Sequence, residues 1–284
     1  MTDPLALQHL FQKRNAETRT HWDEFRSHRE RLTTLLVANR PSASQSLCVL
    51  GAGNCNDLDL PRLLAAFSEI TLVDIDLAAM QEGLARQGTG DSFDRLVLVE
   101  ADVTGTHRTL ERFAARSGGL QETDIQAVLS QLQELPLIAQ LSRQFDCVVS
   151  VCLLSQLIDG VRRVVGEAPD RFVPLVQAIR RQHLATLLRL TAPGGKGILV
   201  FDFVSSLTCP ELLTVADEEL PQLAERLVSQ GNFFTGLRPS IVANDFRAQL
   251  VSLNEGNQPE IVDPWRWNLG PRTYMVQAVM ASLG

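Results

Sequence analysis

Aromatic residues are scarce in this sequence: they make up 6% of 284 residues and include a single tyrosine. An extended surface on which nucleic-acid bases could stack is therefore not expected. Positive charge is also in deficit, because 26 Lys and Arg residues stand against 33 Asp and Glu residues, which gives a net charge of −7. General nucleic-acid binders are usually basic overall, so we expect no nucleic-acid partner.

Cysteine motifs and long apolar runs are missing as well. The five cysteines are an odd number without a CxxC pair or a zinc-ligand spacing, so we expect neither a disulfide framework nor a metal site. The first ten residues lack the basic and apolar regions of a secretory signal. The longest apolar run, 197–204, contains Asp202 and is too short to span a bilayer. These absences predict a cytoplasmic protein without a membrane partner.

The chain does contain enough apolar material for a sizeable core, since 45% of its residues are hydrophobic. Short apolar runs alternate with helical patterns, which is typical of βαβ units and of a parallel sheet covered by helices on both faces. The expected strands are 46–50, 69–74, 95–102, 144–151, 197–204, 260–267 and 272–281, the last two joined by a hairpin-type connection. The main expected helices are 58–67, 77–86, 170–191, 211–230 and 243–253.

A glycine turn follows the first strand, with the sequence Gly51-Ala-Gly53-Asn-Cys-Asn56. Glycine lets the backbone turn tightly and approach a ligand closely, and the helix that follows presents free N–H groups. Glycine-rich strand ends also occur in α/β proteins that bind nothing there. This turn alone therefore does not decide between a ligand site and a simple turn.

Acidic residues end the next two strands. Asp74 can accept two hydrogen bonds from a ribose diol held over the glycine turn. Asp76 could take that role instead, but we assign it as the N-cap of the following helix. Asp102 ends the third strand and can accept a hydrogen bond from the exocyclic amine of an adenine, with Val103 against the ring. The alternative role of Asp102 is that of a turn residue.

The fourth strand ends in the small and polar stretch from Ser150 to Gln156, where a reactive centre could lie. All of these features fall at the carboxyl ends of successive parallel strands. Open α/β sheets bind their ligands at that edge. The combination therefore indicates a ligand site far more strongly than any single feature does.

Together, the motifs at Gly51, Asp74 and Asp102 resemble the class I S-adenosylmethionine-dependent methyltransferases, and so does the run 193–201 before the fifth strand. The resemblance covers about 47–103, 145–204 and 261–284. It implies a doubly wound, mostly parallel, Rossmann-like α/β sheet of seven strands with an antiparallel C-terminal hairpin. It also implies that the chain binds S-adenosylmethionine and transfers its methyl group by in-line displacement to an acceptor.

The resemblance assigns roles to the strand ends. Gly51 and Gly53 would approach the amino-acid part of the cofactor, while 150–153 would line its sulfonium end. Asp74 would bind the ribose hydroxyls, and Asp102 would bind the adenine. The cofactor-binding residues expected in this way are Gly51, Ala52, Gly53, Asn54, Asp74, Ile75, Asp102, Val103, Ser150 and Val151.

Two positions depart from the pattern of the family. Cys55 stands where a third glycine is common, and Val49 stands where an acidic residue is common. Asn54, Asn56 or Asp57 could contact the cofactor's amino group in their place. The departures leave open a second hypothesis, a cofactor-binding pseudoenzyme or regulatory protein. A third, an NAD-dependent dehydrogenase, fits less well because its fingerprint requires a small residue at the position of Asn56.

The acceptor side carries few signals. The candidates for a catalytic base are Asp202, at the end of the fifth strand, and His107, shortly after the third strand. Asp202 could equally be a paired structural carboxylate, and His107 could simply begin a helix. We expect His183 to be a partly buried or solvent-facing helical residue and Tyr274 to belong to the core. The expected acceptor is a small molecule; the sequence leaves O-, N- and C-methylation and the oligomeric state open.

The unmatched segments suggest how the chain is organised. We expect a helical leader or cap at 1–46 and a Rossmann-like methyltransferase domain at 47–284. Within that domain, helical additions are expected at 104–144 and 205–260. Neither addition shows a core of its own, so a second independent domain is not expected.

Overall fold

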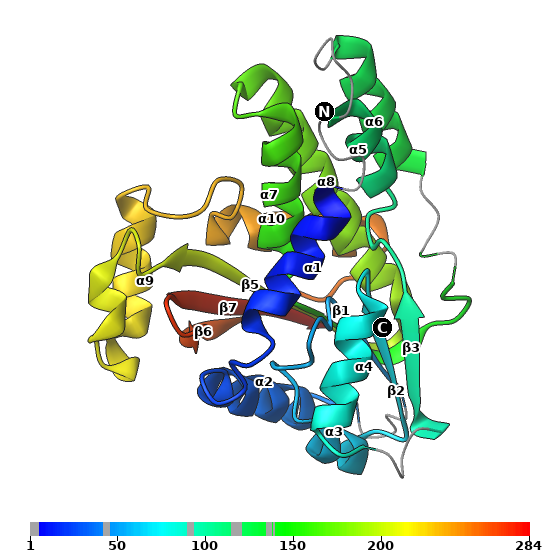
Figure 1. Cartoon of the computed structure of the whole chain (residues 1–284), viewed down its shortest axis with the longest axis vertical. Helices are drawn as coiled ribbons and strands as arrows, with labels where there is room; N and C mark the ends of the chain where they lie inside the picture. Colours follow the sequence, from blue (N-terminus) through cyan, green and yellow to red (C-terminus); the bar gives the residue numbers. More distant parts are fainter. Residues whose placement is uncertain (1–5, 42–45, 90–93, 115–120, 135–137, 139) are drawn as a thin grey trace.

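Seven strands form one central sheet (Figure 1). The computed structural model describes residues 6–41, 46–89, 94–114, 121–134, 138 and 140–284. The sheet order is β3-β2-β1-β4-β5-β7-β6, in which β1 to β5 pair in parallel and β7 lies antiparallel between β5 and β6. The strands are β1 (Ser46–Leu50), β2 (Glu69–Asp74), β3 (Leu96–Glu100), β4 (Phe145–Val151), β5 (Thr191–Ser205), β6 (Glu260–Asn268) and β7 (Thr273–Ser282). The expected α/β fold, a Rossmann-like sheet with an antiparallel C-terminal hairpin, is confirmed.

Helices cover both faces of this sheet. In Figure 1, α2, α3 and α4 lie on one side of it, and α7, α8 and α10 lie on the other. The helices are α1 (Ala6–Thr18), α2 (Arg26–Ala38), α3 (Leu60–Ala66), α4 (Leu77–Arg86), α5 (His107–Ala114), α6 (Glu122–Glu134), α7 (Leu154–Val165), α8 (Pro169–Leu190), α9 (Leu220–Ser229) and α10 (Pro239–Ser252). Strand β1 serves both layers, because Leu47 and Val49 pack with the α2–α4 side while Cys48 and Leu50 pack with the α7–α8 side.

Prolines explain where two helices begin. One helix was expected over 211–230, but α9 starts only at Leu220, after two short 3-10 turns. Pro221 lies in the first turn of α9, the position where its missing N–H costs no hydrogen bond. Likewise, Pro239 opens α10, which was expected to start at 243.

Strand β5 is longer than expected, since it starts at Thr191 directly after α8 rather than at 197. The Pro-Gly-Gly segment in between forms an irregularity in the pairing with β4: Phe145 pairs with Thr191, whereas Cys147 pairs with Lys196. Gly195 is required there because a Cβ atom would lie 2.8 Å from the carbonyl oxygen of Asp146. The segment ends the helix, as predicted, and then joins the sheet.

Helix α1 crosses in front of the sheet at the carboxyl ends of the parallel strands (Figure 1). Phe11 of α1 packs with the α7–α8 cluster, whereas Phe25 packs with the α2–α4 cluster. A division of the chain at residue 46 stays a prediction.

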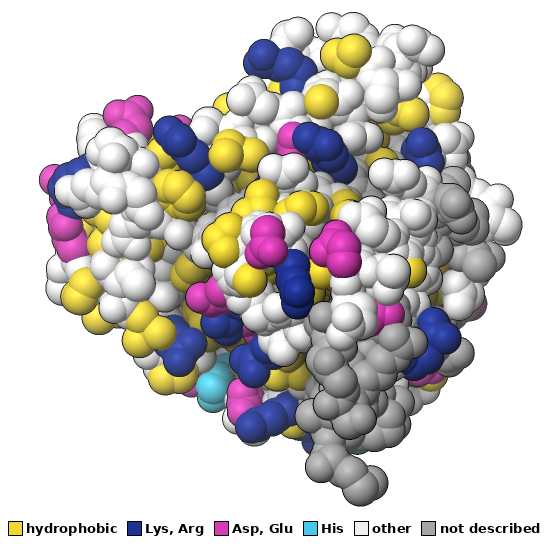
Figure 2. All heavy atoms as spheres, turned by 90° about the horizontal axis from the view of Figure 1, so that it is seen from above, with side chains coloured by type: hydrophobic (Ala, Val, Ile, Leu, Met, Phe, Trp, Pro, Cys, Tyr) yellow, Lys and Arg dark blue, Asp and Glu magenta, His cyan; other side chains and the backbone are white. Residues whose placement is uncertain are grey.

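None of the helices in the described ranges combines the length and apolar character needed to cross a membrane. On the face seen in Figure 2, the described Lys and Arg side chains are interspersed with Asp and Glu and form no continuous basic stripe.

Candidate active site

A cavity of about 930 Å³ lies at the carboxyl edge of the parallel strands. The glycine turn, the ends of β2 and β3 and the start of α7 form one wall, and α1 forms another. Of the expected cofactor residues, those that line this cavity are Gly51, Ala52, Gly53, Asn54, Asp74, Ile75, Asp102, Val103 and Val151. The fold therefore brings nine of the ten expected residues to one cavity.

The glycine turn has the conformation that its sequence predicts. Gly51 and Gly53 have φ values of +82° and +45°, which residues with a side chain rarely adopt. A Cβ atom on Gly51 would also lie 2.9 Å from Cβ of Leu153, so no larger residue fits between the turn and α7. Cys55 adopts φ +54° without being glycine, and its thiol is fully buried in the α2–α4 cluster. A third glycine is therefore replaced by a cysteine that packs in the core.

Asp74 is bound to the glycine turn. Its carboxylate accepts hydrogen bonds from the N–H of Gly53 at 2.8 Å and from the N–H of Asp76 at 3.0 Å. Burial raises the pKa of Asp74 to about 6, although these two hydrogen bonds oppose the shift. Asp76 caps α4 by accepting the N–H of Ala79 at 3.1 Å, as predicted. The two acidic residues thus have different structural roles, and Asp74 is the one that lines the cavity.

Asp102 organises the turn after β3. Its two oxygens accept the backbone N–H groups of Thr104 at 2.9 Å and His107 at 2.8 Å. The imidazole Nδ1 of His107 also lies 3.0 Å from Asp102 Oδ1. Burial alone would raise the pKa of Asp102, but the hydrogen bonds and the charge of His107 outweigh it and lower the pKa to about 2. Asp102 is therefore ionised at neutral pH. The Thr104 hydroxyl also donates to its Oδ1 at 2.8 Å, so Oδ2, which among the described residues accepts only the N–H of His107, is the oxygen with a lone pair for a ligand.

His107 begins α5 and packs its ring against Phe11 of α1, with the ring centroids 5.0 Å apart. It lies beside Asp102, at the end of the cavity away from Asp202. The structure brings His107 to the expected adenine end and Asp202 to the opposite end. The two candidate bases are thus not neighbours.

Ser150 is the expected cofactor residue that does not line the cavity. Its side chain points to the other face of β4, where its Oγ lies 2.7 Å from Nε2 of His183 and both residues are fully buried. His183 was expected to be partly buried or exposed; instead it lies in the core between α8 and the sheet. Burial lowers the pKa of His183 to about 4, so its imidazole is neutral at pH 7. This pair is a buried polar contact of the core.

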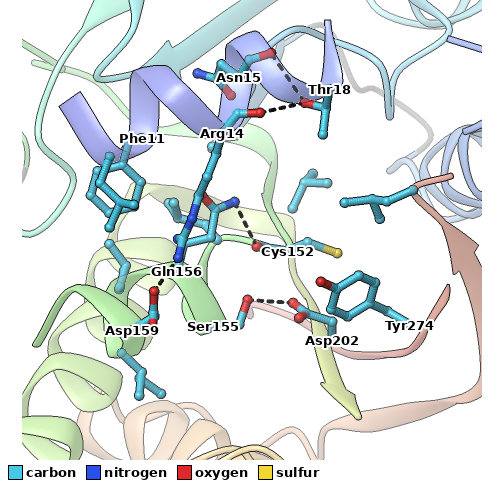
Figure 3. Close-up of a pocket in the computed structure, with 18 of the residues that line it drawn as sticks. Phe11, Arg14, Asn15, Thr18, Cys152, Ser155, Gln156, Asp159, Asp202 and Tyr274 are labelled. Carbon is cyan, nitrogen blue, oxygen red and sulfur yellow. Dashed lines mark hydrogen bonds and ion pairs between the residues drawn. The ribbon is translucent and has the colours of Figure 1, made fainter. Parts of the chain in front are cut away.

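Residues of α1 complete the cavity, although no motif in the sequence pointed to them individually. The Asn54 amide donates to the carbonyl oxygen of Asn15 at 2.6 Å and to Oγ1 of Thr18 at 3.1 Å. The Asn56 amide donates to the carbonyl oxygen of Thr18 at 2.8 Å. Arg14 forms an ion pair with Asp159 of α7 (Figure 3). The two asparagines of the glycine turn therefore hold α1 in place.

Asp202 and Tyr274 face the far end of the cavity (Figure 3). The Ser155 hydroxyl donates to Asp202 Oδ1 at 2.7 Å. Tyr274, which was expected to be part of the core, lies next to the carboxylate and lines the cavity. Sequence reasoning missed Ser155 although it belongs to the polar stretch after β4, and missed Tyr274 because it stands in an otherwise apolar strand.

The stability of the fold is expected to depend on the charge of Asp202. Burial raises the pKa of Asp202 from 3.8 to about 6, and the hydrogen bond from Ser155 offsets only part of that shift. The folded state binds this proton more tightly than the unfolded state, so the free energy of unfolding falls as the pH rises from about 4 to about 6. Above pH 6 the full cost of the buried charge persists.

Asp202→Asn removes this charge with little change in shape. We expect it to raise the free energy of unfolding by about 2–3 kcal/mol at pH 8 and to change it little at pH 4, as measured by urea denaturation. Asp263→Asn, an exchange at an exposed position on the edge strand β6, serves as the control. A less stable D202N protein at pH 8 would contradict the expected cost of the charge.

Comparisons with known proteins give structural similarity only. No family model and no curated protein matches the sequence. The N-methyltransferase NodS from Bradyrhizobium japonicum WM9, in complex with S-adenosylhomocysteine, is 14% identical, with a TM-score of 0.43 over 90% of this chain and 86% of its own. The glycopeptide N-methyltransferase MtfA with S-adenosylmethionine is 15% identical, with a TM-score of 0.44 over 89% and 86%.

The O-methyltransferase TomG from Streptomyces achromogenes, in complex with S-adenosylmethionine, is 11% identical, with a TM-score of 0.43 over 90% of this chain and 79% of its own. Identities and TM-scores this low leave the activity of the chain to be inferred from its own residues.

Proposed function

We propose that this protein is an S-adenosylmethionine-dependent methyltransferase that acts on a small molecule. The observation that carries the proposal is the order of groups along one cavity. The glycine turn, Asp74 and Asp102 lie at three successive strand ends, and Asp202 lies beyond them. A cavity of about 930 Å³ is within the range of known ligand pockets, at its upper end, which suits a cofactor together with a small acceptor.

The residues present fit the cofactor. Gly51 and Gly53 both line the cavity, and because neither has a side chain, a ligand can approach their backbone closely. Asp74 keeps acceptor capacity for the ribose hydroxyls, because its carboxylate has about four acceptor sites and the backbone N–H groups of Gly53, Asp76 and Ile75 use at most three of them. Asp102 and Val103 would hold the adenine.

Asp57 is our candidate for the cofactor's amino group. The side-chain amides of Asn54 and Asn56 are used in hydrogen bonds to α1. Asp57, the third polar residue of this turn, lines the cavity and has a carboxylate that can bind an ammonium group. His28 Nε2 lies 3.2 Å from Asp57 Oδ1. This carboxylate would bind the cofactor's amino group in place of the acidic residue that is common in the family at the position of Val49.

The bound cofactor would supply a methyl group on a positively charged sulfur, and the acceptor atom would bond to that carbon as the carbon–sulfur bond breaks and leaves its electron pair on sulfur. The chain's own contribution is positioning and exclusion of water. Helix α1 covers the cavity through its contacts with Asn54, Asn56 and Asp159.

We also place the protein in the cytoplasm, since its five cysteines are buried and unpaired, as suits a reducing compartment.

Calorimetry with the purified protein tests the proposal. We expect S-adenosylhomocysteine to bind with a dissociation constant on the order of micromolar and NAD⁺ not to bind. Asn56 explains the second expectation, since its side chain is tied to Thr18 and Arg86 where a dinucleotide's pyrophosphate needs a small residue. Binding of NAD⁺ in preference to S-adenosylhomocysteine would overturn the proposal. Cofactor binding without methyl transfer to any acceptor would favour a pseudoenzyme.

A further inference from the structure

The acceptor end of the cavity contains a buried carboxylate with few partners. Asp202 is only 3% exposed, and the Ser155 hydroxyl is the one side chain of the described residues whose hydrogen bond to it is found, at 2.7 Å (Figure 3). A buried carboxylate normally has a cation or several donors around it. Asp202 lines the cavity, and no side chain of the described residues is found to donate a hydrogen bond to its second oxygen, Oδ2.

Arg14 and His28, two basic side chains close to Asp202, make their direct contacts elsewhere. Arg14 is paired with Asp159 of α7. His28 accepts the indole N–H of Trp265 at 2.9 Å on Nδ1, and its Nε2 lies 3.2 Å from Asp57. Neither side chain makes an ion pair with Asp202 among the described residues. Arg14 and His28 thus act on Asp202 without touching it, and a cation in direct contact with this carboxylate would come from a ligand.

Aromatic rings surround the same end of the cavity. Trp267, Tyr274 and Phe234 all line it and form a continuous wall. The ring centroids of Trp267 and Tyr274 are 5.5 Å apart, and those of Tyr274 and Phe234 are 6.1 Å apart. Aromatic faces attract cations, most strongly when water is excluded. They also favour an apolar body next to the cation.

A β-bulge holds this wall in place. Asp202 pairs with Val276 and Val204 with Met275, so Phe203 is an extra residue in β5. The carbonyl oxygen of Phe203 accepts the N–H of Phe234 at 2.6 Å, which fixes the loop between α9 and α10 against the strand. The carboxylate and the aromatic wall are therefore positioned by the sheet.

We propose that this end of the cavity binds the ammonium group of a primary or secondary amine with an apolar body, and that Asp202 Oδ2 receives its proton. This rests on the proposed methyl transfer, for which the nitrogen must be uncharged. The proton moves from nitrogen to the carboxylate, the electron pair of the N–H bond stays on nitrogen as the attacking lone pair, and Asp202 becomes a neutral acid. The proton later returns to solvent. Burial raises the pKa of Asp202 to about 6, which makes it a better proton acceptor than an ordinary carboxylate.

Calorimetry at pH 8 with three probes of similar size tests the inference. The probes are 2-phenylethylamine, which is protonated at this pH, the neutral 2-phenylethanol and the anionic phenylacetate. Each is titrated into the full chain with and without S-adenosylhomocysteine. We expect the amine to bind at least about tenfold more tightly than the alcohol, and phenylacetate to bind least.

Two variants distinguish the effect of the Asp202 carboxylate from the effect of removing any one negative charge near the cavity. Asp202→Asn should weaken amine binding at least about tenfold and leave binding of the alcohol within about twofold. Glu167→Gln removes the same charge from an exposed residue at the rim of the cavity and should leave both affinities unchanged. Unchanged binding of S-adenosylhomocysteine by D202N shows that the variant is folded.

The outcomes are distinct. Equal binding of amine and alcohol, tighter binding of phenylacetate, or an unchanged amine affinity in D202N overturns the amine inference while the cofactor proposal stands. Failure of S-adenosylhomocysteine to bind the wild-type protein overturns the proposed function, whatever the probes show.

Discussion

Asp74→Ala is expected to lower the affinity of the protein for S-adenosylhomocysteine by about 100-fold or more, as measured by calorimetry. The carboxylate does two things at once in the structure. It accepts the backbone N–H groups of Gly53 and Asp76, which shapes the glycine turn, and it lines the cavity where the ribose hydroxyls would lie. Alanine removes both the contacts to the ligand and the support of the turn.

The same residue predicts how binding depends on pH. Because the pKa of Asp74 is raised to about 6, its carboxylate is ionised at pH 8 and becomes protonated below about pH 6. A protonated carboxyl has fewer acceptor sites, so the affinity of the wild-type protein for S-adenosylhomocysteine should fall as the pH drops below 6.

Asp76→Asn is the matched control for Asp74→Ala. Asparagine caps helices as well as aspartate does, so this variant keeps the N–H contact of Ala79 and should bind S-adenosylhomocysteine within a few fold of the wild type. Normal binding by D74A, with a native circular dichroism spectrum, would contradict the role given to Asp74.

Gly83→Ala is expected to destabilise the protein and to weaken cofactor binding, although alanine usually improves a helix by about 1 kcal/mol over glycine. Gly83 lies in α4 against the glycine turn, and a Cβ atom there would be 2.4 Å from the carbonyl oxygen of Asn54 and 2.9 Å from Cβ of Cys55. The contact with Asn54 is to a backbone atom, which cannot turn aside as a flexible side chain can, so either the helix or the glycine turn must move. We expect a loss of about 1–3 kcal/mol in the free energy of unfolding, and at least about a tenfold loss of affinity.

Gly256→Ala provides the comparison for Gly83→Ala, because no heavy atom lies within 4 Å of a Cβ placed there. It should leave both the stability and the affinity near those of the wild type. Urea denaturation and calorimetry measure the two quantities on the same preparations. If G83A matched G256A in both, the glycine turn would be less dependent on α4 than its packing indicates.

Helices and strands whose ends are specified by neighbouring residues in the sequence were predicted correctly. Helix α4 has the predicted ends, because Asp76 is a cap that local chemistry specifies. Strands β1 and β2 match because buried parallel strands are continuous apolar runs. Long-range contacts were not predictable in this way: the amides of Asn54 and Asn56 turned out to bind α1, some 40 residues earlier in the chain.

Strand alternation could have placed Ser150 correctly. Side chains along a strand alternate between faces, and Val149 and Val151 both pack with the α2–α4 cluster. Ser150 must then point to the α8 face, where it meets His183. The partner itself could not be predicted, because the position of α8 over β4 depends on packing of the whole layer. Tyr274 was missed for a similar reason, since its contact with the cavity depends on where β7 begins relative to the end of β5.

The position of β7 in the sheet has a consequence for synthesis on the ribosome. Strand β7 is inserted between β5 and β6, so the long apolar edge of β5 stays unpaired until residues 273–282 have left the exit tunnel. Tyr274 arrives with the same strand, after the rest of the aromatic wall. The nascent chain can therefore assemble the part of the cavity around Asp74 and Asp102 early. Until the last strand is in place, it carries an aggregation-prone strand edge and lacks the wall that Tyr274 completes.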